Sequence, residues 1–468
     1  SPTLIKGKIE DNFLELPAEV LSTVMKVHQR YIPLFLNNAS NDPLSLDAKN
    51  VLLPRFLCIC NGLPSSLETI RKGNEMVLRA RLSDAEFFVK SDLSISSEER
   101  TSQLEKVSFA DGLGSLLNRV KRIEWIVDLL LEKIDINEKN KEYAKEASGL
   151  CKHDLVSHMV GEFPELQGVI GGKYLLAEGK PREVALAVLE HYLPKGQGDN
   201  LPKSDAGSIL ALAERIELLL SIFSKGERPS GSSDPYALRR AGNGILQILW
   251  AKCWHLNLYD LLEKSSLYWA QILPELKIES DALFNELIEF MRQRILSLLE
   301  ESDLDVDIVL SVAGDKHGIK RLLVDPFDAK SRADLLRSMR KSGQLQEVHS
   351  VVTRATRLSE KGDLPKDIYF SSNVINQDLF EKSSEHQFLS IIKSIEPLIS
   401  DTSFERYKQI ANILCSGSKV LEEFFDGEDS VMVMVEDVSI RENRLNLLSL
   451  LRNQSLILAD FNKIKSIR

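Results

Sequence analysis

The residues with the clearest capacity for chemistry lie between residues 152 and 217. Lys152-His153-Asp154 follows an apolar helical pattern, His158 comes one helical turn after Asp154, and Glu190-His191 follows further along the chain. Imidazole and carboxylate groups are ligands for divalent metals, and a bound metal can activate water for phosphoester hydrolysis. Because the groups are distant in the sequence, only the packing of several helices could bring them together.

An adjacent His-Asp pair in a helical bundle resembles the HD superfamily, in which a first His, the doublet and a final Asp converge on a metal. Here Ser115 to Val120 contains no His, and Glu214 stands where the final Asp would fall. Ligand number and geometry set metal affinity, so this incomplete set should bind poorly. We expect His153, Asp154 and Glu214 to be a degenerate set that holds no metal, in a scaffold without catalytic residues. A metal-dependent phosphohydrolase acting on nucleotides or RNA is the alternative.

A second group of candidates is cationic and follows a loop rich in Gly, Pro and Ser at residues 225–235. Ser233-Asp234-Pro235 predicts a helix start, with Asp at the cap and Pro in the first turn. Arg239 and Arg240 then lie near the beginning of the helix. They could contact phosphate, or they could neutralise the region of Asp234.

A third group of cations lies near the end of the chain. Arg441, Arg444 and Arg452 occupy related turns of a predicted helix, opposite an apolar stripe that includes Leu445 and Leu448. This pattern predicts an exposed basic face that suits a phosphate backbone, although a merely solvated face has the same pattern.

Composition places the chain among ordinary globular proteins. It has 468 residues, of which 43% are hydrophobic and 27% charged. No apolar run approaches the roughly 20 residues of a membrane-spanning helix, so we expect no membrane partner. Five cysteines without CxxC spacing predict neither a disulfide framework nor a zinc site. A net charge of -10 argues against indiscriminate coating of nucleic acid but allows a local basic groove.

Periodicity predicts a mainly α chain with a small β component at its beginning. A helix at residues 16–30 is followed by two apolar, β-rich runs, Tyr31 to Leu36 and Phe56 to Cys60. Two strands are too few for a stable sheet, so we expect them to complete a sheet begun before Ser1. From residue 65 onward nearly every segment has helical period, and the charged residues between the apolar positions of Arg119 to Ile134 should face water.

Several phrases, taken in order, resemble the β subunit of the bacterial-type, two-subunit glycyl-tRNA synthetase. They are Met25-Lys-Val-His-Gln-Arg-Tyr-Ile-Pro-Leu-Phe35, Arg79-Ala-Arg-Leu-Ser-Asp-Ala-Glu-Phe-Phe88, Lys152 to Gly168, Glu190-His-Tyr-Leu-Pro194 and Pro229 to Arg240. The segment from Phe424 to Leu451 is similar to the helical anticodon-binding domain shared with the arginyl enzyme. One departure concerns residues 353–358, where the family more usually has an Asn-rich helix start.

The resemblance implies a mainly α fold in three parts. Residues 1–64 would be the C-terminal piece of an α/β tRNA-binding domain, and residues 65–263 an HD-like helical domain. Residues 264–468 would form a helical linker and an anticodon-binding domain, with its core at about 326–468.

The resemblance also implies that this chain recognises tRNA(Gly), while a catalytic α portion attaches glycine with ATP and Mg2+. The chain would then hold no cofactor of its own and would not be catalytic alone. The residues expected to contact tRNA are Lys26, His28, Arg30, Arg239, Arg240, Arg354, Arg357, Arg441, Arg444 and Arg452. A helical scaffold without any RNA role is a further hypothesis.

The start at Ser1, without Met and within a pattern, predicts a fragment of a longer β portion or of a fused enzyme. Inserts rich in Ser and Asn at residues 37–42 and 91–102 favour an organellar protein of the chloroplast, and also of the mitochondrion, over a bacterial cytoplasmic one. The full enzyme is expected to be a homodimer.

Overall fold

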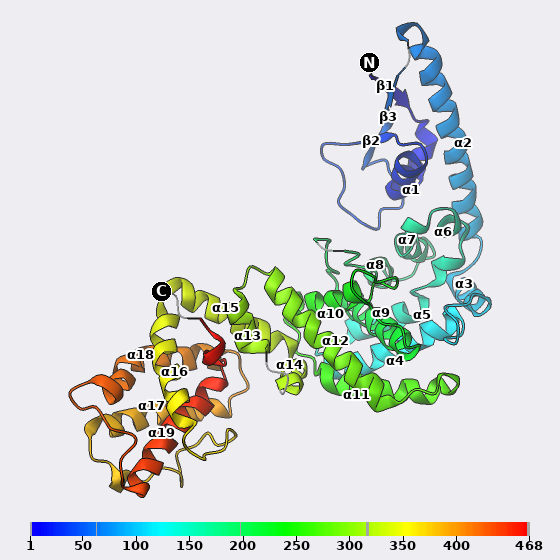
Figure 1. Ribbon diagram of the computed structural model, residues 1–468. Helices are drawn as coiled ribbons and strands as arrows, with labels where there is room; N and C mark the ends of the chain where they lie inside the picture. The colour runs from blue at the N-terminus through cyan, green and yellow to red at the C-terminus, as the bar shows by residue number, and fades with distance from the viewer. Residues whose placement is uncertain (1, 62, 197, 315–317, 466–468) are drawn as a thin grey trace. The chain divides into compact units, whose positions relative to one another are not determined.

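The computed structural model describes residues 2–61, 63–196, 198–314 and 318–465. It divides into two compact units, which are residues 1–248 with 263–284 (unit 1) and residues 249–262 with 285–468 (unit 2). Helices dominate both units, and the strands form one small sheet (Figure 1). The predicted mainly α fold is therefore confirmed. Among the described residues, no helix is long and apolar enough to cross a membrane.

Unit 1 begins with an antiparallel sheet of order β1-β3-β2. Its strands are β1 (Thr3–Lys8), β2 (Ile32–Phe35) and β3 (Leu52–Cys60). The sequence predicted β2 and β3 but not β1, which pairs with β3 from Thr3↔Cys60 to Lys8↔Arg55. Side chains alternate across a pleated strand, so Ile5, Phe56 and Cys58 are buried on one face.

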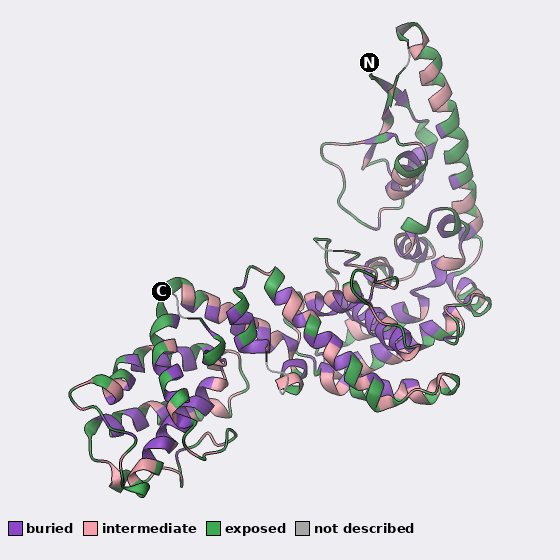
Figure 2. Ribbon diagram, viewed as in Figure 1, coloured by how far each residue is buried: buried purple, intermediate pink, exposed green. Residues whose placement is uncertain are grey.

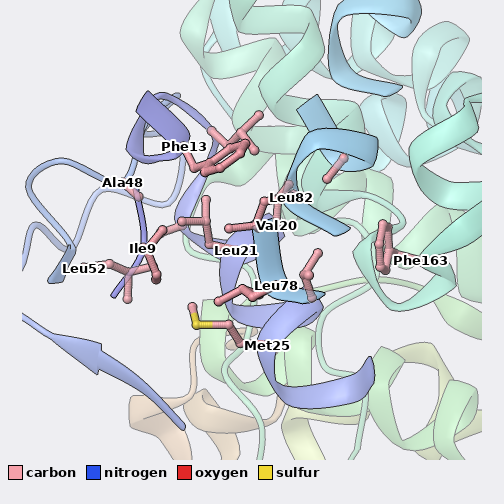
Figure 3. Close-up of a cluster of buried hydrophobic side chains, with 14 of the residues drawn as sticks. Ile9, Phe13, Val20, Leu21, Met25, Ala48, Leu52, Leu78, Leu82 and Phe163 are labelled. Atoms are coloured by element: carbon pink, nitrogen blue, oxygen red, sulfur yellow. The ribbon is translucent and has the colours of Figure 1, made fainter. Parts of the chain in front are cut away.

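Helices cover the buried face of this sheet. They are α1 (Ala18–Thr23), the π-helical turn η2 (Val24–His28) and the long α2 (Leu67–Leu93), preceded by the 3-10 turns η1 (Asp11–Glu15) and η3 (Pro64–Ser66). Figure 3 shows Val20, Leu21, Leu78 and Leu82 among the side chains of this core. The same cluster includes Phe163, so it contains residues from both sides of the boundary predicted at residue 64.

The helical part of unit 1 packs its apolar faces inward, as Figure 2 shows by the burial of its helices. Its described helices are α3 (Ser97–Gln103), η4 (Leu104–Lys106), α4 (Leu116–Lys133), α5 (Glu138–Leu150), η5 (His153–Val156), α6 (His158–Glu162), η6 (Pro164–Leu166), α7 (Val169–Ala177), α8 (Arg182–Glu190) and α9 (Asp205–Ser224). The apolar stripe predicted for α4 is buried. Arg119 and Arg122, which were expected to face water, are buried as well, so that part of the prediction is wrong.

The unit boundaries fall within three helices, α10 (Leu238–Lys252), α11 (Leu258–Ile272) and α12 (Ser280–Glu301). The remaining described elements are η7 (Pro274–Leu276) in unit 1 and, in unit 2, α13 (Val306–Ala313), α14 (Ile319–Val324), α15 (Pro326–Ser342), α16 (Gln344–Ser359), η9 (Gln377–Leu379), α17 (Ser383–Ile399), α18 (Glu405–Asp426), α19 (Val438–Leu456) and η10 (Phe461–Lys463). In unit 2, α17 packs on α18 and α16 on α19.

Candidate functional sites

The His-Asp doublet lies just beyond a helix and not within one. α5 ends at Leu150, and His153 and Asp154 begin the 3-10 turn η5. The imidazole of His153 is completely buried. Its Nδ1 accepts a hydrogen bond from Arg100 Nε at 3.1 Å, and its Nε2 is 3.1 Å from the carbonyl oxygen of Gly171. Since a guanidinium can only donate, Nε2 carries the proton, and both ring nitrogens are engaged by the protein.

Asp154 anchors the beginning of α7. Its Oδ2 accepts the backbone N–H groups of Gly168 at 2.6 Å and of Gly171 at 3.2 Å. Gly168 has a φ of 78°, a conformation that favours glycine, and it immediately precedes the helix. A carboxylate is favourable at this end of a helix, where N–H groups lack partners. His153 and Asp154 therefore make hydrogen bonds within the fold, through both ring nitrogens of His153 and through Oδ2 of Asp154.

An ammonium group lies beside the third member of the degenerate set. Lys152 is fully buried, with Nζ 3.3 Å from Glu214 Oε1 and 3.0 Å from His191 Nε2. Burial alone would raise the pKa of Glu214, but Lys152 and Arg119 hold the pKa of this carboxyl well below its usual range. Burial lowers the pKa of Lys152, while Glu214 opposes that shift.

Glu214 belongs to a larger set that the sequence did not predict. Arg119 donates to Glu214 at 2.8 Å and to Glu217 at 2.7 Å, and Arg122 donates to Glu217 at 2.9 Å. We call Arg119, Arg122, Lys152, Glu214 and Glu217 the buried ion network. The sequence feature that could have indicated this network is equal spacing: the two arginines lie three residues apart on α4, and the two glutamates lie three residues apart on α9.

Cations of the network occupy Glu214, the third member of the degenerate set. Within the described ranges, no group of three or more His, Cys, Asp or Glu side chains is placed to hold a metal ion. Cations pair with Glu214, and hydrogen bonds engage both nitrogens of His153. These interactions supply no feature that favours the phosphohydrolase alternative.

The N-terminal cationic candidates lie together because they share one short segment. Lys26, His28 and Arg30 are all exposed at or just after η2. The Lys26 ammonium is 5.9 Å from the centroid of the Phe35 ring, and the His28 ring meets that of Phe163 edge-on at 5.0 Å. This segment remains accessible to a partner.

Arg239 and Arg240 lie in the first turn of α10, which begins at Leu238, after the predicted cap. The carboxylate of Asp234 accepts the backbone N–H groups of Leu238 at 2.7 Å and Arg239 at 3.0 Å. It therefore caps the helix through backbone groups. Arg240 is exposed and Arg239 half-buried.

The exposed basic face predicted for α19 is wrong for two of its three arginines. Arg444 is only 2% exposed and donates to Glu385 at 2.9 Å and Glu381 at 2.7 Å. Arg452 is 7% exposed, and its guanidinium donates to the Leu364 carbonyl oxygen at 2.9 Å. The physical reason is that α19 packs against both α16 and α17, so the side opposite the leucine stripe is also covered.

The remaining candidates of unit 2 are more accessible. Arg441 is half-buried and donates to the Val435 carbonyl oxygen at 2.9 Å. Arg354 and Arg357 are exposed on α16. Arg354 pairs with Asp426 and stacks on Phe425, with the guanidinium carbon 4.6 Å from the ring centroid.

Comparison with known proteins finds relatives along the whole chain. The family described as glycyl-tRNA synthetase beta subunit matches residues 1–314. A protein named glycine--tRNA ligase beta subunit from Acaryochloris marina is 42% identical over 466 residues, which is 99% of this chain and 64% of the relative. Proteins of the same name from Gloeothece citriformis and Halothermothrix orenii are 41% and 36% identical, over 99% and 97% of this chain. The chain spans 64% and 61% of those two relatives.

Proposed function

This chain belongs to the glycyl-tRNA synthetase β-subunit family, and from that premise we propose that it is the tRNA-recognising portion of a glycine–tRNA ligase. The observation that carries the proposal is the similarity to proteins named glycine--tRNA ligase beta subunit over nearly the full length of the chain. The reaction would be the ATP-dependent attachment of glycine to tRNA(Gly).

In this proposal a catalytic α portion performs the chemistry, using ATP and Mg2+, and the present chain binds and positions tRNA(Gly). The arrangement of the His-Asp doublet supports that division, because the His153 ring accepts from Arg100 and one carboxylate oxygen of Asp154 holds the beginning of α7. The complete enzyme would contain the α portion and would be a homodimer. We further propose a location in the chloroplast and also the mitochondrion, which the 38–42% identity to five cyanobacterial relatives supports for the chloroplast.

The accessible cations are the proposed RNA contacts. They are Lys26, His28, Arg30, Arg239, Arg240, Arg354, Arg357 and Arg441. Arg444 and Arg452 leave the set because they are buried. Phosphate contacts of this kind position an RNA without reading its sequence, so identification of tRNA(Gly) requires base contacts as well.

Two assays test the proposal together. Filter binding should show that the chain binds tRNA(Gly) more tightly than a non-cognate tRNA, with an affinity that falls as salt concentration rises. Glycylation of tRNA(Gly) by the α portion should increase when this chain is added. Absence of tRNA binding at low salt, or glycylation that is indifferent to the chain, would reject the proposal.

A further inference from the structure

The outward face of the small sheet gathers cations and aliphatic side chains. Residues directly opposite in an antiparallel pair share a face, and β1 and β3 pair Leu4 with Ile59, Lys6 with Leu57 and Lys8 with Arg55. β2 adds Ile32 opposite Leu57. We call Leu4, Lys6, Lys8, Ile32, Arg55, Leu57 and Ile59 the basic sheet face.

This face is open in the described structure. Leu4, Ile32 and Ile59 are 60%, 48% and 67% exposed, whereas their neighbours on the other face belong to the core. Lys6, Lys8 and Arg55 are exposed too. A sheet usually covers its apolar face, so three exposed aliphatic side chains beside three cations indicate a surface that meets a partner.

The cations of this face lack partners among the described residues. The three strands contain no Asp or Glu, and none of Lys6, Lys8 and Arg55 makes an ion pair with a residue that the structure describes. Two carboxylates close to β1 interact with helix α2: Glu10 pairs with Arg79, and Glu75 pairs with Arg71 while accepting the Lys8 backbone N–H at 2.8 Å.

Placing these charges side by side has an energetic cost in the absence of a ligand. Lys8 and Arg55 occupy directly opposite positions, where like charges repel each other. Lys6 lies two residues along β1 on the same face, at about 6.7 Å by the rise of a strand. That separation is comparable with the spacing of successive phosphates along an RNA strand, so a polyanion would relieve the repulsion.

We propose that the basic sheet face binds the sugar-phosphate backbone of tRNA, with Lys6, Lys8 and Arg55 on phosphates and the aliphatic side chains against sugar and base surfaces. The inference rests on the proposed function and deepens it by naming the contact. Charge complementarity favours RNA as the occupant, because this face carries three cations and no carboxylate in a chain of net charge -10. A protein surface would have to bury those cations against its own acids.

The test is charge reversal in the complete chain. The variant Lys6→Glu/Lys8→Glu/Arg55→Glu should bind tRNA(Gly) at least about tenfold more weakly at low salt. The negative slope of log affinity against log salt concentration should become less steep by about two to three. A matched control, Lys106→Glu/Lys121→Glu/Lys139→Glu, changes three exposed cations elsewhere in unit 1 by the same charge. The control should keep most of the affinity and of the slope. Circular dichroism should show that both variants are folded.

The outcomes separate the two proposals. If the parent chain binds tRNA(Gly) and the sheet variant binds equally well, the basic sheet face is not an RNA contact, and the proposed function survives. If the parent chain itself does not bind, both proposals fail. A third measurement examines a protein occupant, because Leu4→Ser/Ile59→Ser should then weaken association with the α portion. That result, with unchanged tRNA binding by the charge-reversal variant, would also overturn the inference.

Discussion

Unit 1 places its cations in two opposite environments. In the buried ion network, α4 and α9 set each guanidinium against a carboxylate within 3 Å. On the basic sheet face, strands without any acidic residue leave their cations in solvent. The first arrangement engages its charges within the fold, and the second leaves them available to a partner. The difference is whether a carboxylate or solvent faces each cation. The number of charged residues in the sequence does not reveal it.

This contrast predicts where a mutation will act. Removing one member of a buried pair leaves the other charge desolvated and unpaired, so such a mutation should lower the free energy of unfolding. Removing an exposed, unpaired cation leaves the stability of the fold nearly unchanged, so such a mutation should lower the affinity for tRNA instead. The following substitutions test that division.

The largest effect is expected from Glu217→Ala. The side chain of Glu217 is fully buried and accepts from both Arg119 and Arg122, so its removal leaves two buried guanidinium groups short of a partner. We expect the free energy of unfolding to fall by about 3–5 kcal/mol, measured by urea denaturation. The control Glu142→Ala removes an exposed carboxylate of α5 and should change it by less than about 0.5 kcal/mol. A loss below about 1 kcal/mol for Glu217→Ala would show that the network contributes little to the fold.

A similar but smaller effect is expected from Arg444→Ala in unit 2. Glu385 is fully buried, whereas Glu381 is more than half exposed. After the substitution, only the Glu385 carboxylate would therefore be both unpaired and shielded from water. The expected loss is about 3 kcal/mol, again by urea denaturation. Lys341→Ala, at an exposed position of α15 outside the proposed RNA contacts, serves as the control. Weaker tRNA binding by Arg444→Ala at unchanged stability would instead support the exposed basic face first predicted for α19.

The buried histidines should make stability depend on pH. Burial lowers the pKa of His153 below its ordinary 6.5 and lowers that of His191 much further. Near pH 6.5 and below, the unfolded chain therefore binds protons that the folded chain does not, and stability falls as pH falls through this range. His153→Gln should reduce the slope by as much as one proton, or about 1.4 kcal/mol per pH unit, between pH 6.5 and the lowered pKa of His153.

Urea denaturation at several values between pH 5.5 and 7.5 measures that slope. His386→Gln, which changes an exposed histidine of α17 in the same way, is the matched control. An identical slope for His153→Gln and the parent chain would mean that His153 is protonated alike in both states.

Local pattern was enough to predict much of the fold. The apolar stripe of α4 was predicted from its helical spacing alone, and its side chains are buried. Strand β1 was not predicted because its sequence, Thr3 to Lys8, carries two lysines and a glycine, and because the strand it pairs with in the described structure, β3, lies about fifty residues away. A strand of that composition is recognised from its hydrogen bonds to a neighbouring strand and not from the β-propensity of its residues.

The candidate sites were harder to predict because burial of a charge is a tertiary property. Arg119 and Arg444 both lie on helices with an apolar stripe, and both were assigned to the solvent side. Their burial depends on glutamates placed by other helices, at Glu217 and Glu385. The incompleteness of the His-Asp pattern, by contrast, can be read from the sequence itself, because residues 115–120 contain no His and Glu214 stands at the position of the final Asp.

The smallest effect on stability, and the sharpest contrast with Glu217→Ala, is expected from Arg354→Ala. Arg354 pairs with Asp426, but both side chains are about half exposed, so water replaces the pair when it is broken. The melting temperature should stay within about 1 °C of the parent. If Arg354 contacts tRNA, the same substitution should weaken tRNA(Gly) binding severalfold in filter binding. Asp426→Ala is the matched control, since it releases Arg354 from its carboxylate and should leave affinity equal or higher. Equal weakening by both substitutions would mean that the ion pair orders this surface and that Arg354 makes no phosphate contact of its own.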